Sequence, residues 1–371
     1  MTDAAEHKAA AAAAEPTTET RPQAPVVPAA APRVTWRAKS KPAVQRTPSG
    51  LGAVSVVICS HLAERWDRLR AAVQSIERQT IPVHEVVVVV DGDRDLAALA
   101  ERHLADTCTL LTRDTPGGLS AARNLGLSAV STPFVAFFDD DAEADEHWLE
   151  RLMEPLADPD TLGVGGRSLP RWDAGEPAWF PPELLWAVGC SYAGLPDEIA
   201  PVRNVFGGCA VYRRELFDTN GGFRTDFGRH PGGAAGGEET EFCLRAAARS
   251  PGGRFVYNPA AVMHHHVPAG RATVRYLIRR SADEGRSKAL LLAATHDGAP
   301  RHSAAPRRLA TETTYLRGVV ARGLLPELGG APEEGLWSVA RSAVLALSML
   351  AAAWGFAAGL IGQLRRRHSN A

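Results

Sequence analysis

Three short runs of apolar residues constrain the fold of this chain more than any other feature of its sequence. They cover Ala53–Cys59 (AVSVVIC), Glu85–Val90 (EVVVVV) and Pro133–Phe138 (PFVAFF). A strand without alternating polar residues is buried on both faces, as in a parallel sheet that is covered by helices. The runs therefore predict the central strands of an α/β domain.

Segments with a helical spacing of apolar residues separate these runs. The predicted helices cover Arg68–Gln79, Leu96–Ala105 and Ser120–Val130, and Thr109–Thr112 is a further short strand. Strands and helices that alternate with short links form a doubly wound sheet. We therefore expect a Rossmann-like, mostly parallel sheet with helices on both faces, followed by a C-terminal helical extension.

Acidic residues stand where two of the predicted strands end. Asp91 and Asp93 follow one strand, and Asp139, Asp140 and Asp141 close another. The carboxyl ends of parallel strands share one edge of an open sheet, so we expect the two groups to meet there. Adjacent carboxylates repel one another and raise each other's pKa unless positive charge lies among them. A divalent cation such as magnesium or manganese would supply that charge.

Other interpretations of these strand ends are possible. Asp91-Gly92 alone is also a common turn, because aspartate favours turns and helix caps. A nicotinamide-binding domain needs Gly-x-Gly-x-x-Gly after its first strand, whereas Ser60–Arg65 contains no glycine. A nucleotidyltransferase would have a glycine-rich signature with a basic residue at the same place, which this sequence lacks.

Six motifs between Val54 and Arg245 resemble those of the inverting "family 2" nucleotide-sugar glycosyltransferases, which have the GT-A fold. In chain order they are VSVVIC with Ser60-His61, VVVVVDGDRD, GGLSAARNLGL, FVAFFDDDAEADEHWLERL, GGCAVYRRELFDTNGGF and GGEETEFCLRA. Each motif alone is weak, but six in the order of the family are specific. The resemblance implies sugar transfer from a nucleoside-diphosphate sugar to an acceptor hydroxyl, with inversion and with a divalent metal, Mn²⁺ or Mg²⁺.

The resemblance also implies roles for individual positions. The residues that it places at the nucleotide are Ser60, Asp91, Asp93, Arg123, Asn124, Asp139 and Asp140. Asp139 and Asp141 would be the outer acids of the Asp-x-Asp motif and would bind the metal. The family more often has Asp-Gly-Ser where this chain has Asp-Gly-Asp93, so the role of Asp93 stays open.

The catalytic base implied by the resemblance is Glu239, which stands where the family usually has the aspartate of a Glu-Asp pair. Glutamate is one methylene longer, so either the base reaches further or its loop lies further back. Glu238 is the alternative base. A third interpretation is that Glu238, Glu239 and Glu241 only place negative charge in the first turn of a helix, where the helix dipole favours it.

The triplet His264-His265-His266 is a further candidate for the metal site. In a strand, His264 and His266 face one side and His265 the other. The resemblance implies that a downstream histidine completes the metal site, and we predict His264 and His266 as ligands. Imidazole suits manganese better than magnesium. Packing of the triplet without a metal is the alternative.

The composition changes along the chain and predicts four segments. They are a disordered Ala/Pro-rich tail (1–50), the catalytic domain (51–267), a basic helical extension (268–335) and an apolar helix with an arginine-rich end (336–371). The tail is too poor in large apolar residues to offset the entropy of ordering. Within the extension, Arg271–Leu292 has the pattern of a basic amphipathic helix, which could pack on the domain or meet anionic lipid.

The last segment indicates a membrane. Ala343–Gly362 has no charged residue, and Arg365, Arg366 and Arg367 follow. Such a helix is long enough to span a bilayer, and it could equally lie on one or be buried. With the basic helix, it predicts an enzyme at the cytoplasmic face of the cell membrane that makes bacterial polysaccharide. The expected partners are a UDP-sugar donor and a glycan, lipid-linked or small-molecule acceptor.

The sequence leaves some function classes possible and excludes others. A soluble glycosyltransferase of a small natural product, or an inactive sugar-nucleotide-binding module, stays possible. The chain has 41 Lys+Arg against 42 Asp+Glu, and this balance argues against a nucleic-acid-binding protein. Its five cysteines are scattered, which favours a reduced, cytoplasmic setting.

Overall fold

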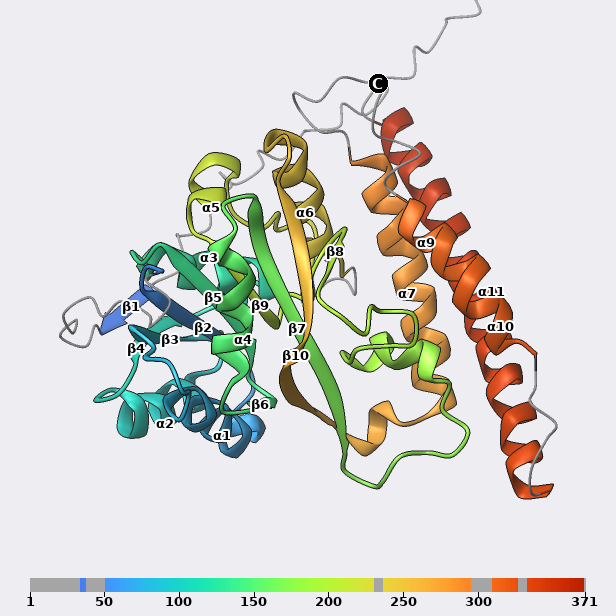
Figure 1. Ribbon diagram of the computed structural model, residues 1–371, viewed down its shortest axis with the longest axis horizontal. Helices are drawn as coiled ribbons and strands as arrows, with labels where there is room; N and C mark the ends of the chain where they lie inside the picture. The colour runs from blue at the N-terminus through green and yellow to red at the C-terminus, as the bar shows by residue number, and fades with distance from the viewer. Residues whose placement is uncertain (1–33, 38–50, 230–235, 295–308, 326–331, 370–371) are drawn as a thin grey trace, which may run out of the picture. The chain divides into compact units, whose positions relative to one another are not determined.

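A ten-stranded sheet with helices on both of its faces forms the centre of the described part of this computed structural model (Figure 1). The structure describes residues 34–37, 51–229, 236–294, 309–325 and 332–369. All of them lie in one unit, Arg33–Ala371. The sheet and its covering helices confirm the predicted α/β class. The predicted division at residues 267 and 335 stays a prediction about segments of this unit.

The first half of the sheet alternates strands and helices as the sequence predicts. Its elements are β2 (Val54–Ser60), α1 (Trp66–Glu77), β3 (Glu85–Asp91), α2 (Arg94–Leu104), β4 (Thr109–Arg113), α3 (Leu119–Ala129) and β5 (Phe134–Asp139). Strands β4, β3, β2 and β5 lie next to one another and are parallel. Their carboxyl ends therefore share one edge of the sheet.

Successive residues of these strands pack on opposite faces, which explains the continuous apolar runs. The other helices that cover the sheet are α4 (Trp148–Met153), α5 (Glu215–Asn220) and α6 (Glu238–Arg249). Val56 and Phe138 pack on the face covered by α1, α2 and α4. Val57 and Phe137 pack on the face covered by α3, α5 and α6. Both faces of each central strand are thus removed from water.

The second half of the sheet is mixed. Its strands are β6 (Ala142–Ala144), β7 (Thr161–Trp172), β8 (Ala200–Val202), β9 (Cys209–Arg213) and β10 (Arg254–Val267). Strand β9 runs antiparallel to both β5 and β7, while β10 runs parallel to β7 and antiparallel to β6. The order is β1-β4-β3-β2-β5-β9-β7-β10-β6, with β8 beside β10. The long strand β10 brings the histidine triplet back beside the end of β5.

Strand β1 (Val34–Arg37) lies antiparallel to β4 at the edge of the sheet. It falls within residues 1–50, and for these four residues the predicted disorder is wrong. Valine, threonine and tryptophan favour strands, and pairing with β4 satisfies their backbone groups. The rest of residues 1–50 lies outside the described part.

Two long helices follow the sheet, and they lie side by side (Figure 1). They are α7 (Val274–Ala293), which is the predicted basic helix, and α11 (Pro332–Ser369). A Cβ atom at Gly285 of α7 would lie 2.0 Å from the carbonyl oxygen of Ala352, and one at Gly355 of α11 would lie 2.0 Å from that of Ala282. Only glycine permits backbones to approach so closely. Shorter pieces, α9 (Ala310–Tyr315), η5 (Leu316–Val320) and α10 (Ala321–Gly323), lie between them in sequence.

In the described residues, Glu334–Arg365 of α11 has the length and apolar composition of a membrane-spanning helix. Composition and length alone do not distinguish a helix that spans a membrane from one that lies on it or packs in a core. Only 22% of its most apolar window is buried within the protein. Most of this apolar surface is therefore left uncovered by the described chain.

The close contact of α7 and α11 predicts that Gly285→Val destabilises the protein. The new side chain must displace the backbone of α11, and overpacking of this kind costs about 1–3 kcal/mol. The measurement is the urea midpoint of unfolding. Gly362→Ala is the matched control, because a Cβ at Gly362 meets nothing within 4 Å. Equal midpoints for Gly285→Val and the wild type would contradict the contact.

Candidate functional site

The two acidic groups predicted from the sequence meet at the carboxyl edge of the parallel strands. The sheet register pairs Cys59 with Asp139 on one side of β2 and Ser60 with Val90, next to Asp91, on the other. This is the edge at which ligands bind in open α/β sheets. The edge is therefore the candidate active site.

Asp139, Asp141 and His265 form a cluster that could hold a metal ion. One ligand atom from each lies within 4.8 Å of the others. Nε2 of His265 lies 3.2 Å from Oδ1 of Asp141 and 4.0 Å from Oδ2 of Asp139. Asp141 and His265 are buried, while Asp139 is partly exposed. Two carboxylates and one imidazole are a donor set that suits manganese, and magnesium less well.

The histidine at this cluster is not one of the two predicted ligands. His264 lies 3.1 Å from Asp145, and His266 lies 2.5 Å from Asp173, so both side chains contact other acids. The strand alternation used in the prediction was right, but the face that meets the acids is that of His265. The antiparallel register of β10 with β6, which pairs His265 with Ala142, puts this residue beside the end of β5.

Positive charge surrounds the acids at the end of β5. Arg65 donates to Asp140 at 2.8 Å and lies 3.3 Å from Asp141, and Arg271 lies 3.9 Å from Asp141. Burial raises the pKa of Asp140. Burial also opposes charge on Asp141, but His265 and the two arginines outweigh it and hold its pKa well below the usual range. The same contact with Asp141 outweighs burial at His265 and raises the pKa of its imidazole to about 10.

Ser60 and Asp91, both predicted nucleotide contacts, are held by neighbouring groups. The Ser60 hydroxyl donates to the carboxylate of Asp140. The Asp91 carboxylate accepts hydrogen bonds from the backbone N–H groups of Gly117 at 2.9 Å and Gly118 at 2.8 Å. Asp91 is only 5% exposed, so it fixes the loop that leads into α3.

Asp93 and Asn124, the other predicted nucleotide contacts near these loops, support the backbone. Asp93 caps α2 by accepting from the N–H of Leu96 at 2.8 Å, and its second oxygen accepts from that of Ala63 at 2.9 Å. The amide of Asn124 both donates to and accepts from the backbone of Phe223, at 2.8 Å each. These hydrogen bonds hold the backbone at Ala63, at the start of α2 and at Phe223.

Arg123 links the metal cluster to the predicted catalytic acids. Its Nη1 donates to Oε1 of Glu238 at 2.8 Å, and its Nη2 lies 3.8 Å from Oδ1 of Asp139. Arg123 and Glu238 are 4% and 5% exposed, so the ion pair is almost fully out of water. A Cβ at Gly208 would lie 2.0 Å from the Asp139 carboxyl carbon, so a side chain at position 208 would displace this carboxylate. The backbone just before β9 therefore lies in close contact with the Asp139 side chain at the end of β5.

Glu239 follows Glu238 in the first turn of α6 and has a different environment. Among the described residues, no cation forms an ion pair with its carboxylate, and its side chain is partly exposed. Burial and the adjacent Glu238 raise the pKa of Glu239 to about 8. The Glu238 carboxylate is held in the ion pair with Arg123, whereas the Glu239 carboxylate forms no ion pair with a cation in the described part of the chain.

Three functional candidates were not identified from the sequence. His265 was assigned to the opposite strand face, and Arg65 was not considered. Arg271 was assigned to a basic helix that could pack on the domain or meet lipid, and it lies against Asp141 with its side chain 15% exposed. The requirement for positive charge among three adjacent acids was a correct signal. It did not identify which residues would supply the charge, because that depends on tertiary packing.

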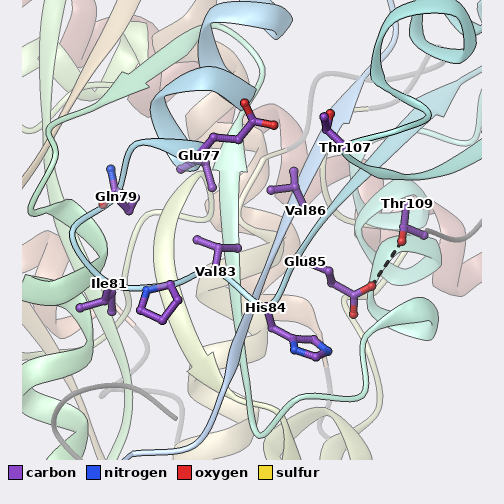
Figure 2. Close-up of a pocket in the computed structure, with 11 residues that line it drawn as sticks. Glu77, Gln79, Ile81, Val83, His84, Glu85, Val86, Thr107 and Thr109 are labelled. Atoms are coloured by element: carbon purple, nitrogen blue, oxygen red, sulfur yellow. Dashed lines mark hydrogen bonds between the residues drawn. The ribbon is translucent and has the colours of Figure 1, made fainter. Parts of the chain in front are cut away.

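A pocket of about 310 Å³ lies away from this edge, beside the amino ends of β3 and β4 (Figure 2). Figure 2 shows His84, Glu85 and Thr109 at the pocket, with Thr109 hydrogen-bonded to Glu85. None of the predicted catalytic, nucleotide or metal residues lines it. The pocket is therefore separate from the candidate active site.

Comparison with known proteins gives matches to a glycosyltransferase family model and to proteins of glycan synthesis. The sequence model "Glycosyl transferase family 2" matches residues 55–221. The chain is 32% identical over 241 residues to the "Glucosyl-dolichyl phosphate glucuronosyltransferase" of Haloferax volcanii, covering 64% of this chain and 77% of that protein. It is 25% identical over 254 residues to the "Succinoglycan biosynthesis protein ExoM" of Rhizobium meliloti, covering 65% and 75%.

A solved structure is similar over most of this chain. It is the mannosyltransferase PcManGT from Pyrobaculum calidifontis in complex with GDP-Man and Mn²⁺, with a TM-score of 0.50 and 20% identity. The similarity covers 86% of this chain and 90% of that one. With the family match, it confirms the predicted GT-A fold.

The raised pKa of Glu239 predicts a pH-dependent effect of Glu239→Gln on stability. The ordinary pKa is 4.5, so between that value and about 8 the folded protein keeps a proton that the unfolded chain has lost. Stability should therefore fall across this window as pH rises in the wild type, and less in the variant. Urea midpoints at pH 5 and pH 8, without metal or nucleotide, measure this. A constant difference between the two proteins would contradict the raised pKa.

Proposed function

The chain belongs to glycosyltransferase family 2, and we propose that it moves a sugar from a nucleoside-diphosphate sugar to an acceptor hydroxyl with inversion and with the help of a divalent cation. The observation that carries the proposal is the position of Arg123. Arg123 lies between the Asp139–Asp141–His265 cluster and the acidic start of α6. A candidate metal-binding group and a carboxylate that forms no ion pair within the described residues, Glu239, therefore flank the same edge of the sheet.

Inverting transfer needs one base and no covalent intermediate. In our proposal, Glu239 takes the proton from the acceptor hydroxyl as its oxygen forms a bond to the anomeric carbon. The bond from that carbon to the diphosphate oxygen breaks at the same time, and the electron pair leaves with the nucleoside diphosphate. A base with a pKa near 8 is better matched to a hydroxyl proton than an ordinary carboxylate.

Glu238 has a positioning role in this proposal. Its ion pair with Arg123 fixes the first turn of α6 relative to Asp139. The alternative in which Glu238 is the base requires that this buried pair break. Since a buried carboxylate without its partner is strongly destabilised, the geometry favours Glu239.

Asp139, Asp141 and His265 would hold the cation. A bound Mn²⁺ or Mg²⁺ would offset the negative charge that grows on the leaving diphosphate. Arg65 and Arg271 lie against the same acids and would add positive charge beside the diphosphate. The pKa of His265 rises because Asp141 stabilises its proton, and a cation at this position would compete with that proton.

The donor and acceptor belong to the proposal as well. The family resemblance favours a UDP-sugar, while the solved mannosyltransferase binds GDP-Man, so a GDP-sugar is the competing donor. The names of the relatives include a dolichyl phosphate sugar and succinoglycan. They support a lipid-linked or growing glycan as acceptor, at the cytoplasmic face of a membrane that the C-terminal segment contacts.

An inactive sugar-nucleotide-binding module is the second candidate. Such a module would have the same fold and nucleotide site but no residue that can act as the catalytic base. The raised pKa of Glu239, whose carboxylate forms no ion pair in the described part of the chain, favours an active enzyme over this candidate. Release of nucleoside diphosphate from none of the UDP-, GDP- and dTDP-sugars would favour the binding module instead.

We expect Glu239→Gln to lower sugar transfer by about 10²–10⁴-fold, the usual contribution of a positioned base. Glutamine keeps the size of the side chain but cannot accept the proton, so nucleotide binding should be retained. Nucleoside diphosphate release and nucleotide titration measure the two properties. Glu238→Gln should instead lower the urea midpoint, because it breaks the pair with Arg123. Turnover retained in Glu239→Gln would assign the base to another residue.

Metal binding should depend on the middle histidine. We expect Asp141→Asn and His265→Ala to lose Mn²⁺ binding, measured by titration without donor, and to lose the Mn²⁺ dependence of nucleoside diphosphate release. His264→Ala is the matched control, because its side chain contacts Asp145 and not the cluster. Loss of Mn²⁺ binding in His264→Ala but not in His265→Ala would support the sequence prediction instead.

A further inference from the structure

One face of α11 has a continuous row of exposed apolar positions. Leu347, Leu350 and Trp354 are 49%, 68% and 62% exposed. The row follows steps of three or four residues, at positions 336, 339, 343, 347, 350, 354, 357, 361 and 364. These steps confine it to an arc of about 100° around the helix, over a length of about 40 Å. We call these nine positions the apolar stripe.

The opposite face of α11 is packed against the protein, which prevents the helix from rotating about its axis. Leu345 and Ser348 are fully buried, and Val344 is 8% exposed. Gly355 and Gly359 lie against Ala282 and Ala289 of α7. The orientation of the stripe is therefore fixed by backbone contacts along the helix pair.

The neighbour of α11 is a charged helix, which argues against a membrane-spanning position. Helix α7 has five basic and two acidic residues in its sequence VRYLIRRSADEGRSKALLLA. The contact between Gly285 and Ala352 holds this charged helix against the middle of the uncharged stretch of α11. If α11 crossed a bilayer, the charges of α7 would enter the hydrocarbon with it, at a large cost in free energy.

Basic side chains border the stripe. The guanidinium of Arg286, on α7, lies 5.2 Å from the ring centre of Trp354. Arg286 and Arg365, which follows the last stripe position, are both exposed. No acidic residue occurs between positions 335 and 369. Tryptophan and arginine next to exposed leucines are typical of helices that lie in the headgroup region of anionic membranes.

We infer that α11 lies flat on the surface of an anionic bilayer, with the apolar stripe in the acyl boundary and the bordering arginines at the lipid phosphates. A second copy of this chain would also cover an apolar stripe, but it would place the arginines of two copies near each other. In an anionic bilayer the acyl chains cover the apolar stripe and the lipid phosphates pair with the arginines beside it. The charges therefore favour anionic lipid over a second copy of the chain.

The flat position of α11 also bears on how an acceptor reaches the active site. This step rests on the proposed function. Helix α7 contacts α11 on one side, and its Ser287 hydroxyl accepts the Gly236 N–H at 3.0 Å, three residues before Glu239. Arg271, close before α7 in sequence, lies against Asp141. The membrane-bound helix pair is therefore joined directly to the catalytic edge. A lipid-linked acceptor would reach Glu239 from the bilayer to which α11 is bound.

Flotation of the full chain with vesicles tests membrane binding. We expect strong flotation with vesicles of phosphatidylcholine and phosphatidylglycerol, and weak flotation with phosphatidylcholine alone. The double variant Leu350→Glu, Trp354→Glu should lower the partition coefficient about 10-fold or more, because it replaces buried hydrocarbon by charge. Ile199→Glu is the matched control, since Ile199 is 52% exposed and lies outside α11. Unchanged flotation of the double variant would overturn the inference.

Labelling of the two helix ends distinguishes a flat helix from a spanning one. The variants Glu334→Cys and Arg365→Cys place a thiol near each end of α11, and a membrane-impermeant maleimide is added to sealed inverted vesicles from expressing cells. A flat helix labels at both ends from the same side. Labelling of one end in inverted vesicles and of the other in right-side-out vesicles would overturn the inference. So would a dimer in solution that the double variant dissolves, without flotation of the wild type.

Nucleoside diphosphate release in the same samples separates this inference from the proposed function. The double variant should retain release with a water-soluble acceptor, because neither Leu350 nor Trp354 is one of the predicted base, nucleotide or metal residues. Flotation without release in the wild type would contradict the proposed function alone. Release without flotation would contradict the membrane inference alone.

Discussion

The buried ion pair between Arg123 and Glu238 is the interaction on which the candidate active site depends. It joins α3 to the first turn of α6, and its guanidinium also lies beside Asp139 at the end of β5. Helix α3 and strand β5 follow each other in the sequence, whereas α6 begins about 100 residues later. A charged pair that is almost completely removed from water needs good geometry to be stable, since desolvation opposes it. The pair therefore fixes the distance between the metal cluster and Glu239.

The same edge divides chemically similar residues into different roles. Of two adjacent glutamates, Glu238 is neutralised by Arg123, while Glu239 forms no ion pair within the described residues and has a raised pKa. Among three adjacent aspartates, burial raises the pKa of Asp140, whereas His265, Arg65 and Arg271 keep Asp141 charged. Environment, rather than residue type, thus separates a candidate base from a positioning acid and a candidate metal ligand from its neighbour.

The first half of the fold was predictable because each central strand is an uninterrupted apolar run and each helix has a clear period. The observed elements from β2 to β5 begin and end within two residues of the predicted ranges. The second half was harder, since β7, β9 and β10 pair out of sequence order and partly antiparallel. Register on these strands decides which side chain faces the site. A shift of one residue exchanges His265 for His264 or His266, so the sequence did not identify which histidine lies beside Asp141.

The sequence by itself determined the α/β class, the edge of the sheet where acids collect, the family and the apolar character of the last helix. These properties are local, because they follow from the period of apolar residues and from short motifs. Only the tertiary structure decided that His265 faces the acids, that Arg65 and Arg271 balance their charge, and that Asp93 and Asn124 bind backbone. It also decided that α11 is packed on one face against a charged helix. Each of these depends on contacts between residues distant in sequence, which strand register and close helix packing alone establish.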